Sequence, residues 1–287
     1  MEPEENKVPE DFEQLNKLFD KRIELIRINH SANLQFIEES LTYLLKLRNF
    51  LQQKMNAKYS PENRIPNNLA ISFFLLDRNI LYIYSSYSLF LKSLVDPAKE
   101  HERVMLESAL VNYSLTHGEF AMQYYEKILP ILNQIFDKIN SENIDAELLA
   151  MHDEWKKSCR NGTTIARLAD ELYKITDKQR AKDVECELLK IYESTLSLSS
   201  HANIINLASN TEIKQENLTK ELIVFSSMLI FYLVSLVEIF HEFITEDETM
   251  YTNFTKLIDK GVKVVDGRLI PLPNSSKVSL EVQWRKK

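Results

Sequence analysis

The chain has 287 residues, of which 44% are hydrophobic and 27% charged. This length and composition are those of a folded soluble protein and exclude global disorder. Its four glycines, at positions 118, 162, 261 and 267, are too dispersed to form a glycine-rich loop for phosphates or dinucleotides. Sheet-rich folds need many turn residues with positive φ, so the shortage of glycine favours a mainly helical protein.

The formal net charge is −7, and the first twenty residues contribute most of it, with seven acidic residues against two lysines. No overall basic field exists to attract nucleic acid, although a local basic groove could still bind it. Cys159 and Cys186 form neither a metal-binding C-x-x-C motif nor a disulfide framework. No secretory hydrophobic segment is recognised near the acidic start, so we expect a cytoplasmic protein.

Apolar residues recur every three or four positions from about residue 11 to 58, which predicts one long amphipathic helix or two, with a weak point at 29–31. Residues 68–95 are apolar almost all round, which is typical of a helix at the centre of its domain. Asp96 is predicted to cap the next helix, with Pro97 as its first residue and its end near residue 116.

In the second half of the chain, Gly118 and Pro130 predict a kink or a boundary before residue 140. The segment 218–244 is predicted to be the most hydrophobic helix, and a last helix is expected to end at Gly261. Shorter helices are expected between these two regions, at 144–159, from 163 or 164 to 173, and at 176–198.

The C-terminal pattern differs from the rest of the chain. Residues 262–265 and 269–272 flank Asp266-Gly267, which predicts a β-hairpin with a type I′ turn, and alternating apolar residues at 278–284 predict a further strand. The expected fold is therefore mainly α, a multi-helix bundle with a small C-terminal β-hairpin and strand element. An acidic disordered leader would occupy 1–10, the helical domain 11–260, and the β-appendage 261–287.

The run from Leu222 to Val237 has sixteen uncharged residues between two glutamates. A membrane-spanning helix needs about 20 apolar residues. Because the run is shorter than that, we expect a buried core helix and make a membrane partner the less favoured interpretation. A membrane-associated helical protein stays open as an alternative.

Asp77 and Arg78 are the feature of the 68–95 segment to which we give most weight. Buried charges are costly unless paired, and adjacent helical residues point about 100° apart, so these two cannot neutralise each other. At least one is expected to find a partner on another helix. The pair could form a buried clamp that holds the bundle or line an anion or substrate pocket.

A second polar cluster surrounds His201 in a mainly apolar segment, with Tyr192, Ser197, Ser200 and Asn203. These groups could form a structural hydrogen-bond network or a functional pocket, since histidine suits proton transfer near neutral pH. Glu238 and His241 form an E-x-x-H pair, but di-metal bundles need a second such pair and further glutamates. We therefore predict no metal and no cofactor.

Three short segments resemble a bacterial all-helical family, domain of unknown function 5677. They are the apolar helix around Arg78, the Asp96-Pro97 helix start that continues to Arg103, and the segment from Tyr192 to His201. The resemblance spans about residues 65–210 and implies a helical fold with a candidate Arg78/His201 pocket. Tyr82 stands where that family has an acidic residue, and we expect it to belong, with Asp77, to a binding site or buried polar network. The Arg-x4–6-His motif of the neighbouring HEPN-type nucleases and toxins is missing.

The leading functional hypothesis is a binding or regulatory module, in bacterial stress or phage defence, that captures a protein partner or forms a homo-oligomer through helix faces. The exposed faces of the 11–58 helix and the alternating tail are the expected surfaces. The enzyme alternative is a metal-independent nuclease in which Arg78 holds a phosphate and His201 acts as acid and base.

Overall fold

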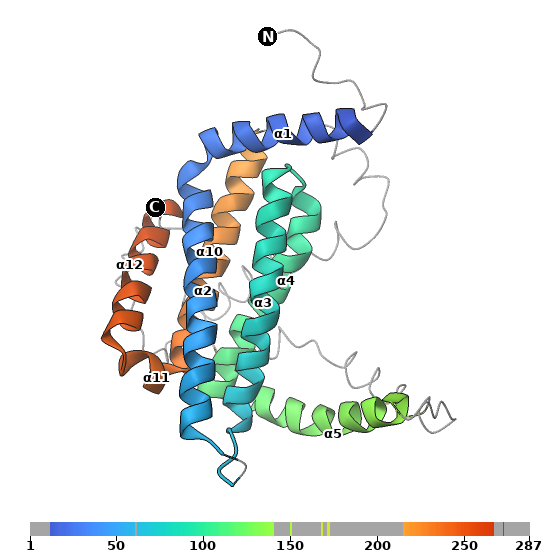
Figure 1. The fold of residues 1–287 in the computed structure, drawn as a ribbon, viewed down its shortest axis with the longest axis vertical. Helices are drawn as coiled ribbons and strands as arrows, with labels where there is room; N and C mark the ends of the chain where they lie inside the picture. The colour runs from blue at the N-terminus through green and yellow to red at the C-terminus, as the bar shows by residue number, and fades with distance from the viewer. Residues whose placement is uncertain are drawn as a thin grey trace.

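The computed structural model describes residues 12–60, 62–140, 150, 168, 171–172, 215–266 and 272. Within those residues the chain forms helices and no strand, so the expectation of a mainly helical protein is confirmed (Figure 1). The helices are α1 (Phe12–Asn29), α2 (Ser31–Lys58), α3 (Asn67–Leu91), α4 (Val95–His117), α5 (Phe120–Asn140), α10 (Gln215–Ile239), α11 (His241–Thr245) and α12 (Glu248–Val264).

Five long helices, α2, α3, α4, α10 and α12, run lengthwise side by side (Figure 1). Helix α1 crosses one end of this bundle, and α5 extends outward from the opposite end. Helix α10 contacts α2, α3, α4 and α12. The hydrophobic core therefore surrounds α10, which joins the two sides of the bundle.

Helix α10 is long and apolar enough to cross a membrane by length and composition alone. In the fold, however, 89% of its most hydrophobic window is buried by other parts of the protein. Every residue from Phe225 to Val237 is buried, including Ser226, Ser227 and Ser235. The expectation that 222–237 is a core helix is confirmed, and this arrangement is compatible with a soluble protein.

Helix α3 lies at the outside of the bundle, which corrects the expectation that the 68–95 segment is central. It packs mainly against α4 and α2, and its third side faces solvent. Phe74, Leu81 and Tyr84 on that side are 73%, 70% and 60% exposed. Its apolar composition therefore reflects two buried faces and one exposed apolar face.

The predicted weak point at 29–31 is a real break, because α1 ends at Asn29 and α2 begins at Ser31. His30 between them is buried, and burial lowers the pKa of its imidazole. Helix α4 begins at Val95, so Asp96 lies inside its first turn and is not the predicted cap. Pro97 is tolerated there because the first N–H groups of a helix have no acceptor within the helix.

Gly118 separates α4 from α5, as predicted, but α5 continues through Pro130 to Asn140 without a boundary at the proline. The expected helix at 218–244 is instead divided at Phe240 into α10 and α11. Of the helix expected from 163 or 164 to 173, only Leu168, Glu171 and Leu172 are described, and all three are helical.

The structure corrects the first strand of the expected hairpin, because α12 continues through Gly261 to Val264. The spacing of its buried residues Leu257, Ile258, Gly261 and Val265 places them on one helix face. Asp266 has φ 50°, a left-handed conformation that ends many helices. Most of the second strand, the strand at 278–284, and the helices expected at 144–159 and 176–198 lie outside the described residues, apart from single positions.

Gly261 is a contact residue and does not end the helix. A Cβ atom at this position would lie 2.6 Å from the ring of Phe36 on α2 and 2.9 Å from Ile230 on α10. Its missing side chain therefore lets α12 approach both helices closely.

Candidate functional site

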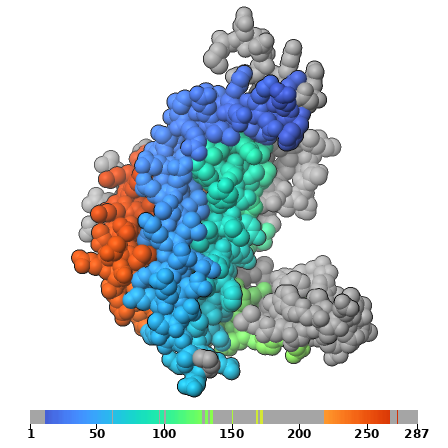
Figure 2. Space-filling model, in the orientation of Figure 1, coloured from blue at the N-terminus to red at the C-terminus, as the bar shows by residue number. Residues whose placement is uncertain are grey.

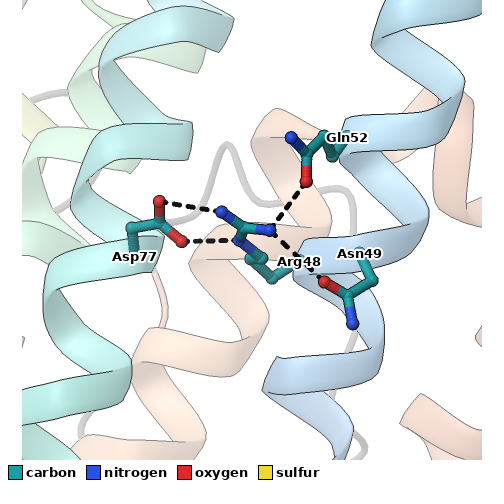
Figure 3. Close-up of polar contacts among 4 residues, drawn as sticks. All are labelled: Arg48, Asn49, Gln52 and Asp77. Carbon is teal, nitrogen blue, oxygen red and sulfur yellow. Dashed lines mark hydrogen bonds and ion pairs between the residues drawn. The ribbon is translucent and has the colours of Figure 1, made fainter.

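Asp77 and Arg78 each find a partner on another helix, as predicted, but on opposite sides of α3. Arg48 of α2 donates from Nε to Asp77 Oδ1 at 2.8 Å and from Nη2 to Oδ2 at 3.4 Å (Figure 3). Arg48 also donates from Nη1 to Gln52 Oε1 at 2.7 Å. The hydrogen bond and the negative charge of Asp77 raise the pKa of Arg48.

Arg78 turns toward α4, where its Nη2 donates to Ser108 Oγ at 3.3 Å. Its guanidinium also lies 6.0 Å from the ring centre of Tyr82, within the range of a cation–π contact. Arg78 is exposed and Asp77 is half-buried. The expectation that these charges are buried is therefore wrong, because the apolar neighbours around them belong to an outer helix.

Tyr82, the next predicted site residue, is half-buried beside α4. Its ring centre lies 5.0 Å from that of His101. The other predicted members, Tyr192, Ser197, Ser200, His201 and Asn203, lie outside the described residues. The structure therefore places Arg78 and Tyr82 together at the α3–α4 surface, and the meeting of Arg78 with His201 stays a prediction.

The side of α3 between these two anchored charges carries an apolar stripe. Phe74 and Leu81 are seven residues apart, so they lie about 20° apart around the helix axis. The charged side chains point away from the line through Phe74 and Leu81: Asp77 points toward α2 and Arg78 toward α4. We call Phe74, Leu81 and the adjoining Tyr84 the α3 stripe; Figure 2 shows α3 at the molecular surface beside α2.

The interface between α4 and α10 contains several polar groups, of which only Glu238 was singled out from the sequence. Asn112 Nδ2 donates to Ser235 Oγ at 3.2 Å, and His117 Nε2 lies 3.1 Å from Glu238 Oε2. Glu102 is only 1% exposed. Ala98, Glu102, Met105, Ala109 and Asn112 follow a three-four spacing, which was the signal that could have placed the polar members on the buried face.

The carboxyl group of Glu102 in this interface has a raised pKa. Burial is the main cause that raises its pKa to about 8, and the charge of Glu221 adds to the effect, while Lys99 opposes it. Lys99 is itself paired with Glu221, with 2.8 Å between Nζ and Oε1. Burial inside the bundle therefore favours the neutral, protonated form of Glu102.

A carboxylate occupies the N-terminus of α5. Glu171 Oε1 accepts hydrogen bonds from the backbone N–H groups of Glu119 at 2.6 Å and Phe120 at 2.8 Å. Ser114 donates to Glu171 Oε2 at 2.5 Å and accepts from the N–H of Ala121 at 3.0 Å. These contacts satisfy three backbone N–H groups at the start of α5, so this helix end has a structural partner.

The E-x-x-H pair does not act as a unit, because Glu238 faces His117 and His241 begins the separate helix α11. Among the residues that the structure describes, no group of three or more histidine, cysteine or acidic side chains is placed to hold a metal ion.

Comparison with family models, curated proteins and solved structures finds no match to this chain. The interpretation of the site therefore depends on its geometry. Among the described residues, the α3 stripe is a candidate binding surface, because its large apolar side chains are exposed to water.

Proposed function

We propose that this protein is a helical interaction module that binds an apolar helix of a protein partner through the α3 stripe. The observation that carries the proposal is the exposure of Phe74 and Leu81 on one line of a rigid helix. Single exposed apolar residues are common on protein surfaces, but aligned ones at helical spacing form the anchor pattern of helix-to-helix recognition.

The surroundings of the stripe support this role. Hydrogen bonds join both flanks of α3 to its neighbours: Arg48 of α2 to Asp77, and Arg78 to Ser108 of α4. These contacts fix the position of the stripe in the unbound protein. Preorganisation lowers the entropic cost of binding. The exposed guanidinium of Arg78 beside the stripe adds a polar group that can fix the register of a bound helix.

The outer faces of α1 and α2 and the alternating tail at 278–284 were the surfaces expected from the sequence. The tail lies outside the described residues, and α1 exposes Phe12, Leu25 and Ile28. These three do not share one line of the helix, because at about 100° per residue Phe12 lies roughly 140–160° around the axis from Leu25 and Ile28. We therefore favour α3 over α1 as the principal contact.

A photo-crosslinking amino acid in place of Leu81 tests the proposal in cells that express the full chain. The matched control places the same amino acid at Tyr251, an exposed aromatic position on α12. We expect a discrete adduct from position 81 that Phe74→Ser weakens, and none from position 251. No adduct at position 81, or equal adducts at both positions, would overturn the proposal.

A further inference from the structure

We propose that α1 is a hinged arm: two contacts hold it across the end of the bundle, and it straightens with α2 into one continuous helix when those contacts open. This inference concerns a different part of the molecule from the α3 stripe and does not depend on the proposed function. It starts from His30, the single residue that separates the two helices.

The hydrogen-bond pattern of an α-helix continues through the break at His30. Its N–H donates to the carbonyl of Ile26 at 2.8 Å, and its carbonyl accepts from the N–H of Leu34 at 3.0 Å. The backbone of His30 has φ −126° and ψ 28°, whereas helical residues have φ of about −63° and ψ of about −42°. A rotation of the backbone at this residue can therefore bring α1 into line with α2.

Few buried side chains hold α1 against the bundle. Ile26 is the buried residue among the eighteen of this helix. Leu15, Leu18, Phe19 and Ile23 lie on the same side of α1 as Ile26 and are only partly buried. Because segments with few buried apolar contacts open at low free-energy cost, α1 can leave the bundle while the long helices stay packed.

The imidazole of His30 adds a cost to the docked state, in which α1 lies across the bundle. The side chain is buried, and no described group forms a hydrogen bond with its Nε2. A buried polar atom without a partner is unfavourable, and water satisfies it when α1 moves away. Opening therefore recovers part of the free energy that the broken contacts cost.

Two contacts at the surface keep the arm docked. Arg27 Nη2 donates to the hydroxyl of Tyr87 on α3 at 3.1 Å, that hydroxyl donates to Glu38 on α2, and Arg27 Nη1 lies 3.6 Å from Glu38 Oε1. Nearer the middle of α1, the ring centre of Phe19 lies 5.6 Å from Nζ of Lys92, just after α3. Half-exposed ion pairs and cation–π contacts are each weak, so they hold the arm reversibly.

Straightening changes the surface that the protein presents. In the docked state, α1 crosses the end of the bundle with its apolar side inward (Figure 1). In the straight state this side, from Leu15 to Ile26, becomes an exposed apolar helix face, and the surface beneath it is uncovered. Both surfaces suit a second amphipathic helix, so the arm controls when they are available.

Pulsed electron paramagnetic resonance on the full chain measures the arm. Non-natural keto amino acids in place of Asn16 on α1 and Lys46 on α2, both exposed, take the spin labels and leave the native cysteines unlabelled. In one continuous helix these positions lie about 45 Å apart, at about 1.5 Å per residue, and they are closer when the chain bends at His30. We expect the shorter distance to dominate in the original chain.

Removal of the two contacts is expected to populate the straight state. Arg27→Gln combined with Phe19→Ala is expected to raise the fraction of the long distance at least about tenfold, and Arg27→Gln alone about threefold. Lys260→Gln is the matched control, because it removes a similarly exposed ion pair to α2, from Lys260 to Glu39, that does not involve α1. Circular dichroism and melting temperatures verify that the bundle stays folded in each variant.

A double variant that shows only the short distance would overturn the proposal, because α1 would stay docked without these contacts. A broad spread of distances with no separate population near about 45 Å would also overturn it, since α1 would then unfold instead of straightening. An equal increase in Lys260→Gln would show that the contacts of α1 do not control the arm, and the proposal would fall.

Discussion

His117 on α4 and Glu238 on α10 meet at the end of the bundle, with 3.1 Å between Nε2 and Oε2, and the side chain of Glu238 is fully buried. With its proton on Nε2, the imidazole of His117 donates to the carboxylate of Glu238. This contact between His117 and Glu238 joins two helices that are more than one hundred residues apart in the chain.

Removal of this imidazole is expected to destabilise the fold. His117→Ala leaves a buried carboxyl group with one fewer donor, which costs about 3 kcal/mol of unfolding free energy. Urea denaturation measures the loss. His241→Ala, which removes the other histidine near Glu238 in sequence, is the matched control and is expected to have a small effect. Equal losses in the two variants would contradict the assigned pairing.

The buried acid Glu102 predicts a pH dependence of stability. Its pKa is raised from 4.5 to about 8 in the folded protein, so the folded state holds the proton more tightly than the unfolded chain. The stabilisation is complete below about pH 4.5, declines as the pH rises, and is lost above about pH 8. Glu102→Gln is expected to be more stable than the original chain at pH 9 and similar to it at pH 4.5.

Thermal or urea unfolding at both pH values checks this expectation. Glu24→Gln, at an exposed position on α1, is the control and is expected to leave the pH profile unchanged. An identical pH profile for Glu102→Gln and the original chain would show that this carboxyl group is not the source of the dependence.

The cap of α5 predicts a coupled pair of substitutions. Glu171→Ala removes the acceptor for two backbone N–H groups and is expected to cost about 1–2 kcal/mol. Gly118→Ala is also expected to be destabilising, since its Cβ would lie 2.3 Å from the carboxyl carbon of Glu171. In the double variant that clash is gone, so its loss of unfolding free energy is expected to be smaller than the sum of the losses in the two single variants. A loss equal to that sum would contradict the contact between position 118 and Glu171.

The close approach at Gly261 predicts that a single methyl group destabilises the bundle. Gly261→Ala gains helix propensity but presses on the buried ring of Phe36, and overpacking of this kind costs about 1–3 kcal/mol. Chemical denaturation measures the change. Phe36→Leu is expected to reduce the cost of Gly261→Ala, and a cost that is the same in both backgrounds would contradict the clash.

The amino-acid pattern by itself determined the helical class, the break at His30, the boundary at Gly118 and the buried nature of the 222–237 helix. These features depend on residues close together in the chain, whose apolar spacing and glycine content fix local structure. The same local pattern misassigned 262–265, where three valines and one lysine fit a strand as readily as the last turn of a helix.

Only the tertiary structure decided which apolar helix is enclosed. Both α3 and α10 are rich in apolar residues, yet α10 is surrounded by α2, α3, α4 and α12, while α3 is covered mainly by α2 and α4. Apolar content measures how much surface a helix can bury, and burial itself depends on neighbours that arrive from distant parts of the chain. For that reason Asp77 and Arg78 lie at a surface, and Glu102, Asn112 and Glu238 lie inside.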